Sequence, residues 1–152
     1  MILLGASAVL LGSCHKETPL PAAQPSGNAR VVYELREKCG KDANEWFKRE
    51  HSNDGVLDGD VITTIQDEYT NHYNEKLNRC YALVLKSTLI HAPKGKHGNT
   101  KSATLVDVNE NAETGSYFEN DESARPIKCF VRDSVCGSLT EWNALASPYM
   151  IQ

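Results

Sequence analysis

The pattern of hydrophobic and polar positions predicts a helix at residues 30–50. Hydrophobic residues recur there at gaps of three and four, which places most of them on one helical face. Charged residues fill most of the remaining positions. Gly40 weakens the middle of the segment and is compatible with two shorter helices. The apolar positions are Val31, Val32, Leu35, Cys39, Ala43, Trp46 and Phe47.

Strands are expected in the middle of the chain. Residues 79–90 give the clearest signal, because residues 80–85 are almost continuously hydrophobic, as in a strand buried on both faces. Residues 61–77 fit both a helix and a strand, but their Thr and Asn content disfavours a helix interior, so we favour a strand at residues 69–74. Further strands are expected at residues 102–108, 115–119 and 127–131.

A short helix is expected to close the chain at residues 138–146, with Ser138 or Thr140 as its N-cap. The order of elements is then a helix, a meander of about four or five strands, and a helix. Short connections favour antiparallel pairing, so the predicted fold class is α+β.

The N-terminal segment predicts export and lipidation. Residues 2–11 are uncharged and apolar, and two small residues and Cys14 follow. Such a stretch is typical of a signal peptide. Leu11-Gly12-Ser13-Cys14 resembles the lipobox of bacterial lipoproteins, which implies a signal peptide at residues 1–13 and acylation of Cys14 by fatty acids such as palmitate. The alternative is a buried N-terminal strand with an incidental cysteine.

The resemblance also bears on location. His15 follows the cysteine, where an Asp would be the inner-membrane retention signal of enterobacterial lipoproteins, so the outer membrane is favoured over the inner membrane. Residues 14–29 carry three prolines and few large apolar side chains, which predicts a tether. The globular domain is then expected at residues 30–152. Residues 69–81 are similar to small cysteine-containing lipoproteins of proteobacteria that have no assigned activity.

Export implies an oxidising compartment, so the cysteines other than Cys14 are expected to form disulfides. Four cysteines remain, which allows three connectivities. We favour Cys39–Cys80, which would join the first helix to the central strand, and Cys129–Cys136, which would close a small loop. No CxxC pair is present, so neither a metal site nor a redox pair is predicted from the cysteines.

The chain has 152 residues, 40% of them hydrophobic and 24% charged, as in a single soluble domain. The net charge of -4 gives no reason to expect nucleic acid as a partner. Charge is nevertheless segregated. Residues 86–101 hold four Lys, two His and no acid, whereas residues 107–122 hold six acids and no Lys or Arg. This pattern indicates either a bipolar surface for a charged partner or anionic lipid, or neighbouring loops that attract each other.

The densest group of hydrogen-bonding side chains is Tyr69, Asn71, His72 and Tyr73. Such residues can line a binding groove, and His72 with Glu68 or Asp67 can act as a general base. The alternative is a hairpin in which the aromatic rings pack and the Asn side chains bond to turns.

No catalytic, phosphate-binding or metal-binding motif is present, and no cofactor is predicted. The hypothesis is therefore a non-catalytic, lipid-anchored binding or accessory module of the cell envelope. It would reach the membrane through acylated Cys14 and contact a protein or cell-wall partner. The alternatives are a small envelope hydrolase that uses His72, and a purely structural role.

Overall fold

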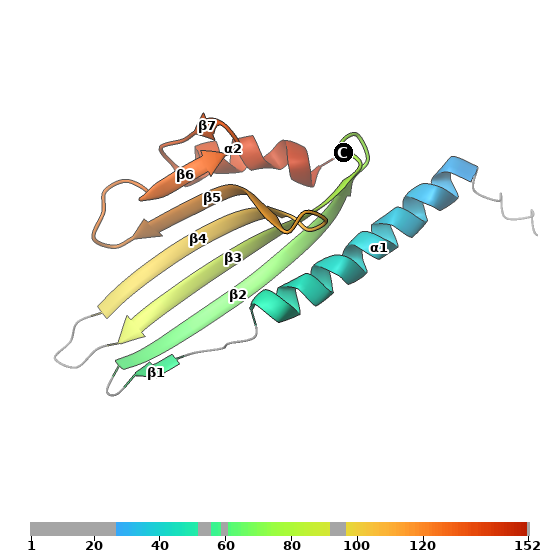
Figure 1. Cartoon of the computed structure of the whole chain (residues 1–152). Coiled ribbons are helices and arrows are strands. Elements are labelled where there is room, and N and C mark those ends of the chain that lie inside the picture. Colours follow the sequence, from blue (N-terminus) through green and yellow to red (C-terminus); the bar gives the residue numbers. More distant parts are fainter. Residues whose placement is uncertain (1–26, 52–55, 59–60, 92–96, 152) are drawn as a thin grey trace, which may run out of the picture.

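The computed structural model describes residues 27–51, 56–58, 61–91 and 97–151 (Figure 1). The predicted signal peptide, Cys14 and most of the predicted tether lie outside these residues. No helix in the described part is long and apolar enough to cross a membrane. The elements are α1 (Gly27–Glu50), β1 (Val56–Asp58), β2 (Val61–Asn74), β3 (Arg79–His91), β4 (His97–Asp107), β5 (Ala112–Asn120), β6 (Lys128–Val131), β7 (Ser134–Val135) and α2 (Leu139–Met150).

All strands belong to one antiparallel sheet, in which they follow each other in chain order from β1 to β7. The predicted α+β class is confirmed, with an N-terminal helix, an antiparallel meander and a short C-terminal helix. The sheet has seven strands because β1 and β7 join its edges. The strand predicted at residues 69–74 is the second half of β2, which begins at Val61.

Helix α1 is continuous through Gly40, so the possible division into two helices does not occur. A Cβ atom at position 40 would lie 3.8 Å from the Asn71 side chain, which places Gly40 against β2. The helix begins at Gly27, so the last three residues of the predicted tether are helical. Packing of its apolar face against the sheet outweighs the cost of one glycine, which is about 1 kcal/mol.

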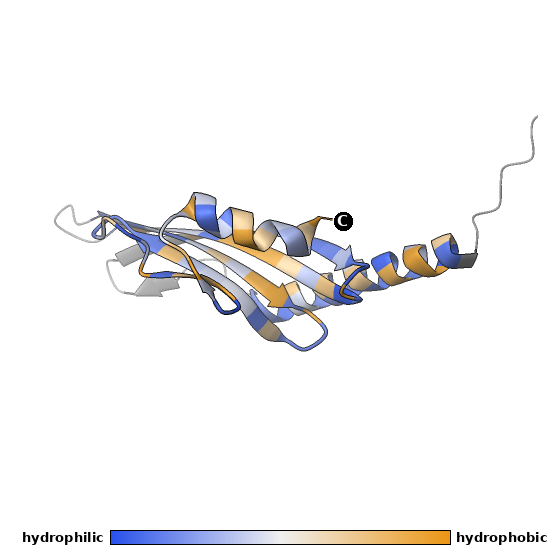
Figure 2. Ribbon diagram, turned by 90° about the horizontal axis from the view of Figure 1, so that it is seen from above, coloured by the Kyte–Doolittle hydropathy of each residue, from blue (hydrophilic) through white to orange (hydrophobic). Residues whose placement is uncertain are grey.

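The two helices cover opposite faces of the sheet (Figure 2). On the α1 side, buried Trp46 packs against Ala82 and Val84 of β3 and Val106 of β4. On the α2 side, a second core surrounds fully buried Trp142. Its other buried members are Tyr81, Ala103, Leu105, Tyr117, Cys129, Val131 and Ala146.

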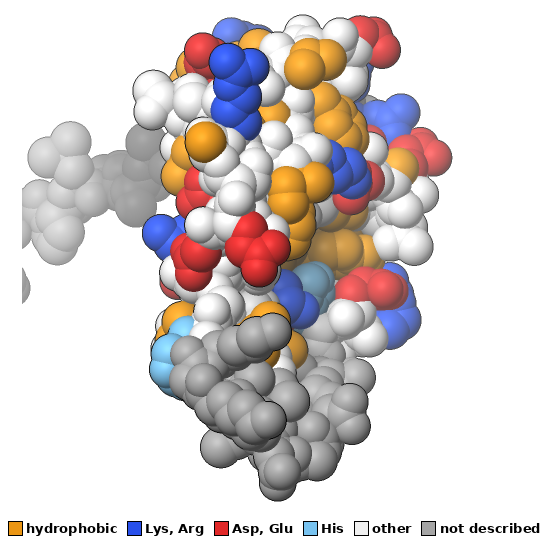
Figure 3. Space-filling view, turned by 90° about the vertical axis from the view of Figure 1, so that its left-hand side faces the viewer, with side chains coloured by type: hydrophobic (Ala, Val, Ile, Leu, Met, Phe, Trp, Pro, Cys, Tyr) orange, Lys and Arg blue, Asp and Glu red, His pale blue; other side chains and the backbone are white. Residues whose placement is uncertain are grey.

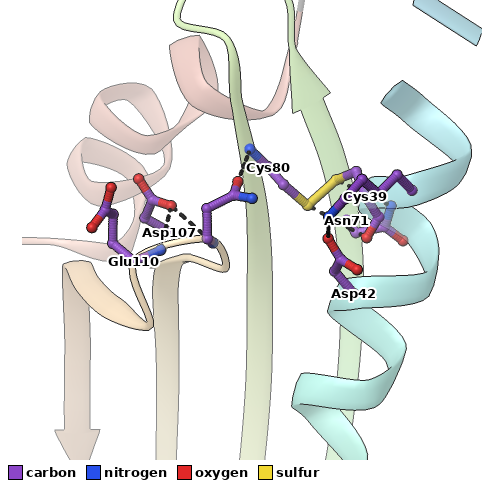
Figure 4. Close-up of a disulfide and its surroundings, with 8 residues drawn as sticks. Cys39, Asp42, Asn71, Cys80, Asp107 and Glu110 are labelled. Carbon is purple, nitrogen blue, oxygen red and sulfur yellow. Dashed lines mark hydrogen bonds and ion pairs between the residues drawn. A yellow bond between two sulfur atoms is a disulfide. The ribbon is translucent and has the colours of Figure 1, made fainter. Parts of the chain in front are cut away.

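Both predicted disulfides are present. Cys39–Cys80 joins α1 to the start of β3, as Figure 4 shows, and Cys129–Cys136 joins β6 to the segment before α2. The Cys80 backbone amide also donates a hydrogen bond to Asn109 Oδ1 at 3.0 Å. The disulfides therefore attach each helix, or the segment leading to it, to the sheet.

Candidate functional site

Helix α2 covers only one end of its face of the sheet. Its N-cap Ser138 accepts a hydrogen bond from the Glu141 amide at 3.2 Å, which begins the helix beside β6. At the other end of the helix, Asn74 Nδ2 of β2 donates to the Pro148 carbonyl at 2.9 Å. The helix thus crosses the sheet near the β2–β3 turn and leaves the opposite end of this face open.

The open end of the face forms a groove of about 750 Å³, which we call the α2-side groove. Strand register fixes its floor, because Glu68, Leu85, Ala103 and Tyr117 lie directly opposite one another across β2, β3, β4 and β5. Leu139, the first residue of α2, also lines the groove. The other lining residues are Ile65, Gln66, Asp67, Lys86, Ser87, Lys101 and Ser102.

The groove combines apolar and charged side chains. Leu85 and Leu139 are each 40% exposed, which is high for large apolar residues. Glu68 supplies a negative charge and Lys101 a positive charge. Figure 3 shows one end of the molecule, where hydrophobic side chains lie exposed among charged side chains of both signs. An open, mixed surface of this kind suits recognition rather than the enclosure of a small reactant.

Tyr117 lies buried in the floor of the groove, and its hydroxyl donates a hydrogen bond to Glu119. Burial, and then the hydrogen bond to Glu119 and the charge of that carboxylate, raise the pKa of Tyr117 to about 12. Glu119 also lies directly opposite Lys101 in the β4–β5 register. The tyrosine is therefore held neutral beside a carboxylate at the floor of the groove.

The raised pKa of Tyr117 predicts a specific loss of stability in alkali. In the unfolded chain the same tyrosine ionises near pH 10. The stabilisation that neutral Tyr117 gives to the folded state is therefore fully present below about pH 10, and it is lost as the pH rises from about 10 to about 12. In a spectrophotometric titration of tyrosinate, Tyr117→Phe should remove one of the late-ionising tyrosines. Glu119→Gln should lower the pKa of Tyr117 only in part, because burial is the larger cause. An unchanged late phase in Tyr117→Phe would contradict this assignment.

Three of the predicted binding residues face α1 and make structural contacts. The Tyr69 ring stacks on Phe47 with 4.4 Å between ring centroids. Buried Tyr73 donates its hydroxyl proton to Asn78, and Asn71 Nδ2 lies 3.9 Å from Cys39 Sγ. The aromatic packing agrees with the alternative interpretation of this segment, but Asn71 contacts the Cys39 sulfur of α1 rather than a turn.

His72 lies half-buried in β2, and burial followed by the nearby Arg36 guanidinium lowers its pKa below the usual value. Its Nε2 atom has no hydrogen-bond partner among the described residues. Glu68 lies four residues away along the strand, about 13 Å at the usual rise per residue. Asp67 lies on the opposite face of β2 by strand alternation, so the structure does not bring His72 to either carboxylate.

Sequence reasoning missed the actual partner of Asp67, which is His51. His51 Nδ1 lies 2.9 Å from Asp67 Oδ2, and Lys86 Nζ lies 3.8 Å from the same oxygen. The His51 ring stacks on Phe47 with 4.7 Å between centroids. This contact fastens the residue after α1 to β2 and β3. No signal in the sequence linked His51 to Asp67, because their approach depends on where α1 ends over the sheet.

The segregated charges are partly neutralised within the fold. Lys101 lies opposite Glu119, and Arg79 Nη1 lies 3.1 Å from Asp107 and 2.6 Å from Glu110. Lys128 pairs with Glu113 at 2.7 Å. Arg79 and Lys128 lie outside the basic segment 86–101, so these ion pairs neutralise part of the acidic segment but do not decide between a bipolar surface and attraction between the two segments.

No group of three or more His, Cys, Asp or Glu side chains in the described ranges is arranged to hold a metal ion. No family model, curated protein or solved structure matches the chain. The α2-side groove is therefore the candidate functional site on its geometry alone.

Proposed function

We propose that this protein is a non-catalytic binding module of the bacterial cell envelope. It is anchored to the membrane through acylated Cys14 and binds its partner in the α2-side groove. The lipobox-like segment Leu11-Gly12-Ser13-Cys14 supports the anchor, and His15 favours the outer membrane. More than one acyl chain gives stable attachment, whereas a single chain gives only marginal binding.

The observation that carries the proposal is that α2 leaves part of an apolar sheet face open. Leu85 and Leu139 stay substantially exposed there, although the neighbouring part of the same face is fully buried under Trp142. Exposed apolar side chains framed by charged ones are characteristic of a protein-interaction surface.

The groove favours a protein segment over a cell-wall glycan. Sugar rings bind best to exposed aromatic rings, but the Tyr117 ring is buried and its hydroxyl is committed to Glu119. The groove instead offers exposed leucines, with Glu68 and Lys101 beside them. These side chains complement a polypeptide that carries apolar, basic and acidic side chains. We therefore propose a protein partner.

The test is crosslinking in cells followed by affinity purification from solubilised envelopes. Four forms are compared: wild type, Leu85→Asp, Leu77→Asp and Cys14→Ala. Leu77 is a matched control, because it is 45% exposed and lies outside the α2-side groove. One envelope protein should be enriched at least tenfold with wild type and Leu77→Asp, and lost with Leu85→Asp. Cys14→Ala should lose both labelled palmitate and the partner.

The outcomes separate the parts of the proposal. A partner retained by Leu85→Asp would show that the groove is not the binding surface. Absence of any enriched protein with wild type would overturn the proposed protein-binding function. Labelling of Cys14→Ala by palmitate would overturn the proposed anchor.

A further inference from the structure

Two histidines meet where β3 ends and β4 begins. His91 and His97 lie directly opposite each other in the register between these strands. Their Nδ1 atoms are 3.2 Å apart, and both side chains are exposed. Residues directly opposite in an antiparallel pair point to the same face, so the sheet itself holds the two rings together.

The separation of the two nitrogens matches that of two ligands on one metal ion. Imidazole nitrogens bind zinc at about 2.0–2.1 Å, so two of them at angles between 90° and the tetrahedral angle lie about 2.8–3.4 Å apart. The observed 3.2 Å falls within this range. The present contact is a hydrogen bond between the two rings, so a metal ion would replace it after the exposed rings turn to point both nitrogens at the ion, with the strands in place.

We propose that His91 and His97 form a binding site for a divalent transition-metal ion such as Zn²⁺ or Ni²⁺. Neutral imidazole suits these ions, whereas Ca²⁺ and Mg²⁺ prefer oxygen ligands. No further His, Cys, Asp or Glu completes a group of three here among the residues that the structure describes. Two protein ligands leave the other coordination positions to water, so the site is open and its ion exchangeable.

The sequence alone did not indicate this site. Five residues separate His91 from His97, a spacing that also occurs in zinc fingers, but the closely spaced cysteine pair that completes the zinc-finger motif is absent. The two histidines become neighbours only through the pairing of β3 with β4, which runs from Tyr81 opposite Asp107 to His91 opposite His97. Because both side chains are exposed, their replacement should leave the cores intact.

The experiment is calorimetric titration of the full chain with Zn²⁺ and, separately, Ni²⁺. Cys14→Ala is used as the background, since Cys14 is the one cysteine outside the two disulfides. One ion should bind per chain, and His91→Ala and His97→Ala should each weaken binding at least tenfold. His72→Ala is the matched control and should bind as the background protein does. Zn²⁺ should also shift the ¹⁵N resonances of the His91 and His97 rings.

Binding that survives both His91→Ala and His97→Ala would place the ion elsewhere and overturn the proposal. Failure of the background protein to bind either ion would overturn it as well. Circular dichroism of each variant separates loss of metal binding from loss of folding. A variant that keeps the spectrum of the background protein but binds the ion more weakly has lost a metal-binding side chain and not its fold.

Discussion

Replacing Cys39 and Cys80 together by alanine is expected to lower the free energy of unfolding by about 4 kcal/mol. The bond links residues 41 positions apart, so in the chain-entropy description it removes much of the freedom of the unfolded chain. It also fastens α1 to β3, and α1 supplies one of the two cores. A domain of this size is stable by about 5–15 kcal/mol, so this loss is large.

The second disulfide provides the comparison. Cys129 and Cys136 are only 7 positions apart, and the same description gives about 2.5 kcal/mol for their replacement by alanine. Urea unfolding of the two double variants, followed by fluorescence and circular dichroism, measures both effects. Equal losses, or a larger loss for the Cys129–Cys136 variant, would show that native-state contacts rather than loop length set the contribution of these bonds.

Much of the fold was accessible from local patterns. Cys80 to Leu85 are all apolar because this part of β3 has a core on each of its faces, and a continuous apolar run of this length predicts a buried strand. The first half of β2 was not predicted, because its many polar residues do not alternate clearly with hydrophobic ones. Its place in the sheet comes from pairing with β3. The strands β1 and β7 have three and two residues, too few for any periodicity.

The candidate site was harder to predict for a physical reason. Leu85, Tyr117 and Leu139 reach the α2-side groove from two strands and a helix, and each is an ordinary apolar position in its own segment. Whether such a position is covered depends on how far α2 extends over the sheet. The approach of His51 to Asp67 depends likewise on tertiary placement, whereas that of His91 to His97 depends on the register between β3 and β4.

Replacing Trp142 by alanine is expected to lower the free energy of unfolding by about 3–5 kcal/mol. Trp142 is fully buried at the centre of the α2-side core, so its removal leaves a cavity and loses packing. Its Nε1 atom also donates a hydrogen bond to the Phe130 carbonyl at 3.1 Å. Leu139→Ala is the control on the same helix, with an expected loss below about 1.5 kcal/mol, since Leu139 is 40% exposed.

Trp142→Phe distinguishes packing from the hydrogen bond. Phenylalanine keeps most of the ring volume but leaves the Phe130 carbonyl without its donor, so the expected loss is about 1–3 kcal/mol. Urea unfolding of the three variants measures the loss in free energy of unfolding. We expect the largest loss for Trp142→Ala, an intermediate loss for Trp142→Phe and the smallest loss for Leu139→Ala. A loss for Trp142→Phe equal to that for Trp142→Ala would assign the contribution to the hydrogen bond. Trp142 therefore anchors α2 to one end of the sheet face, and the α2-side groove lies at the end of the same face that α2 does not cover.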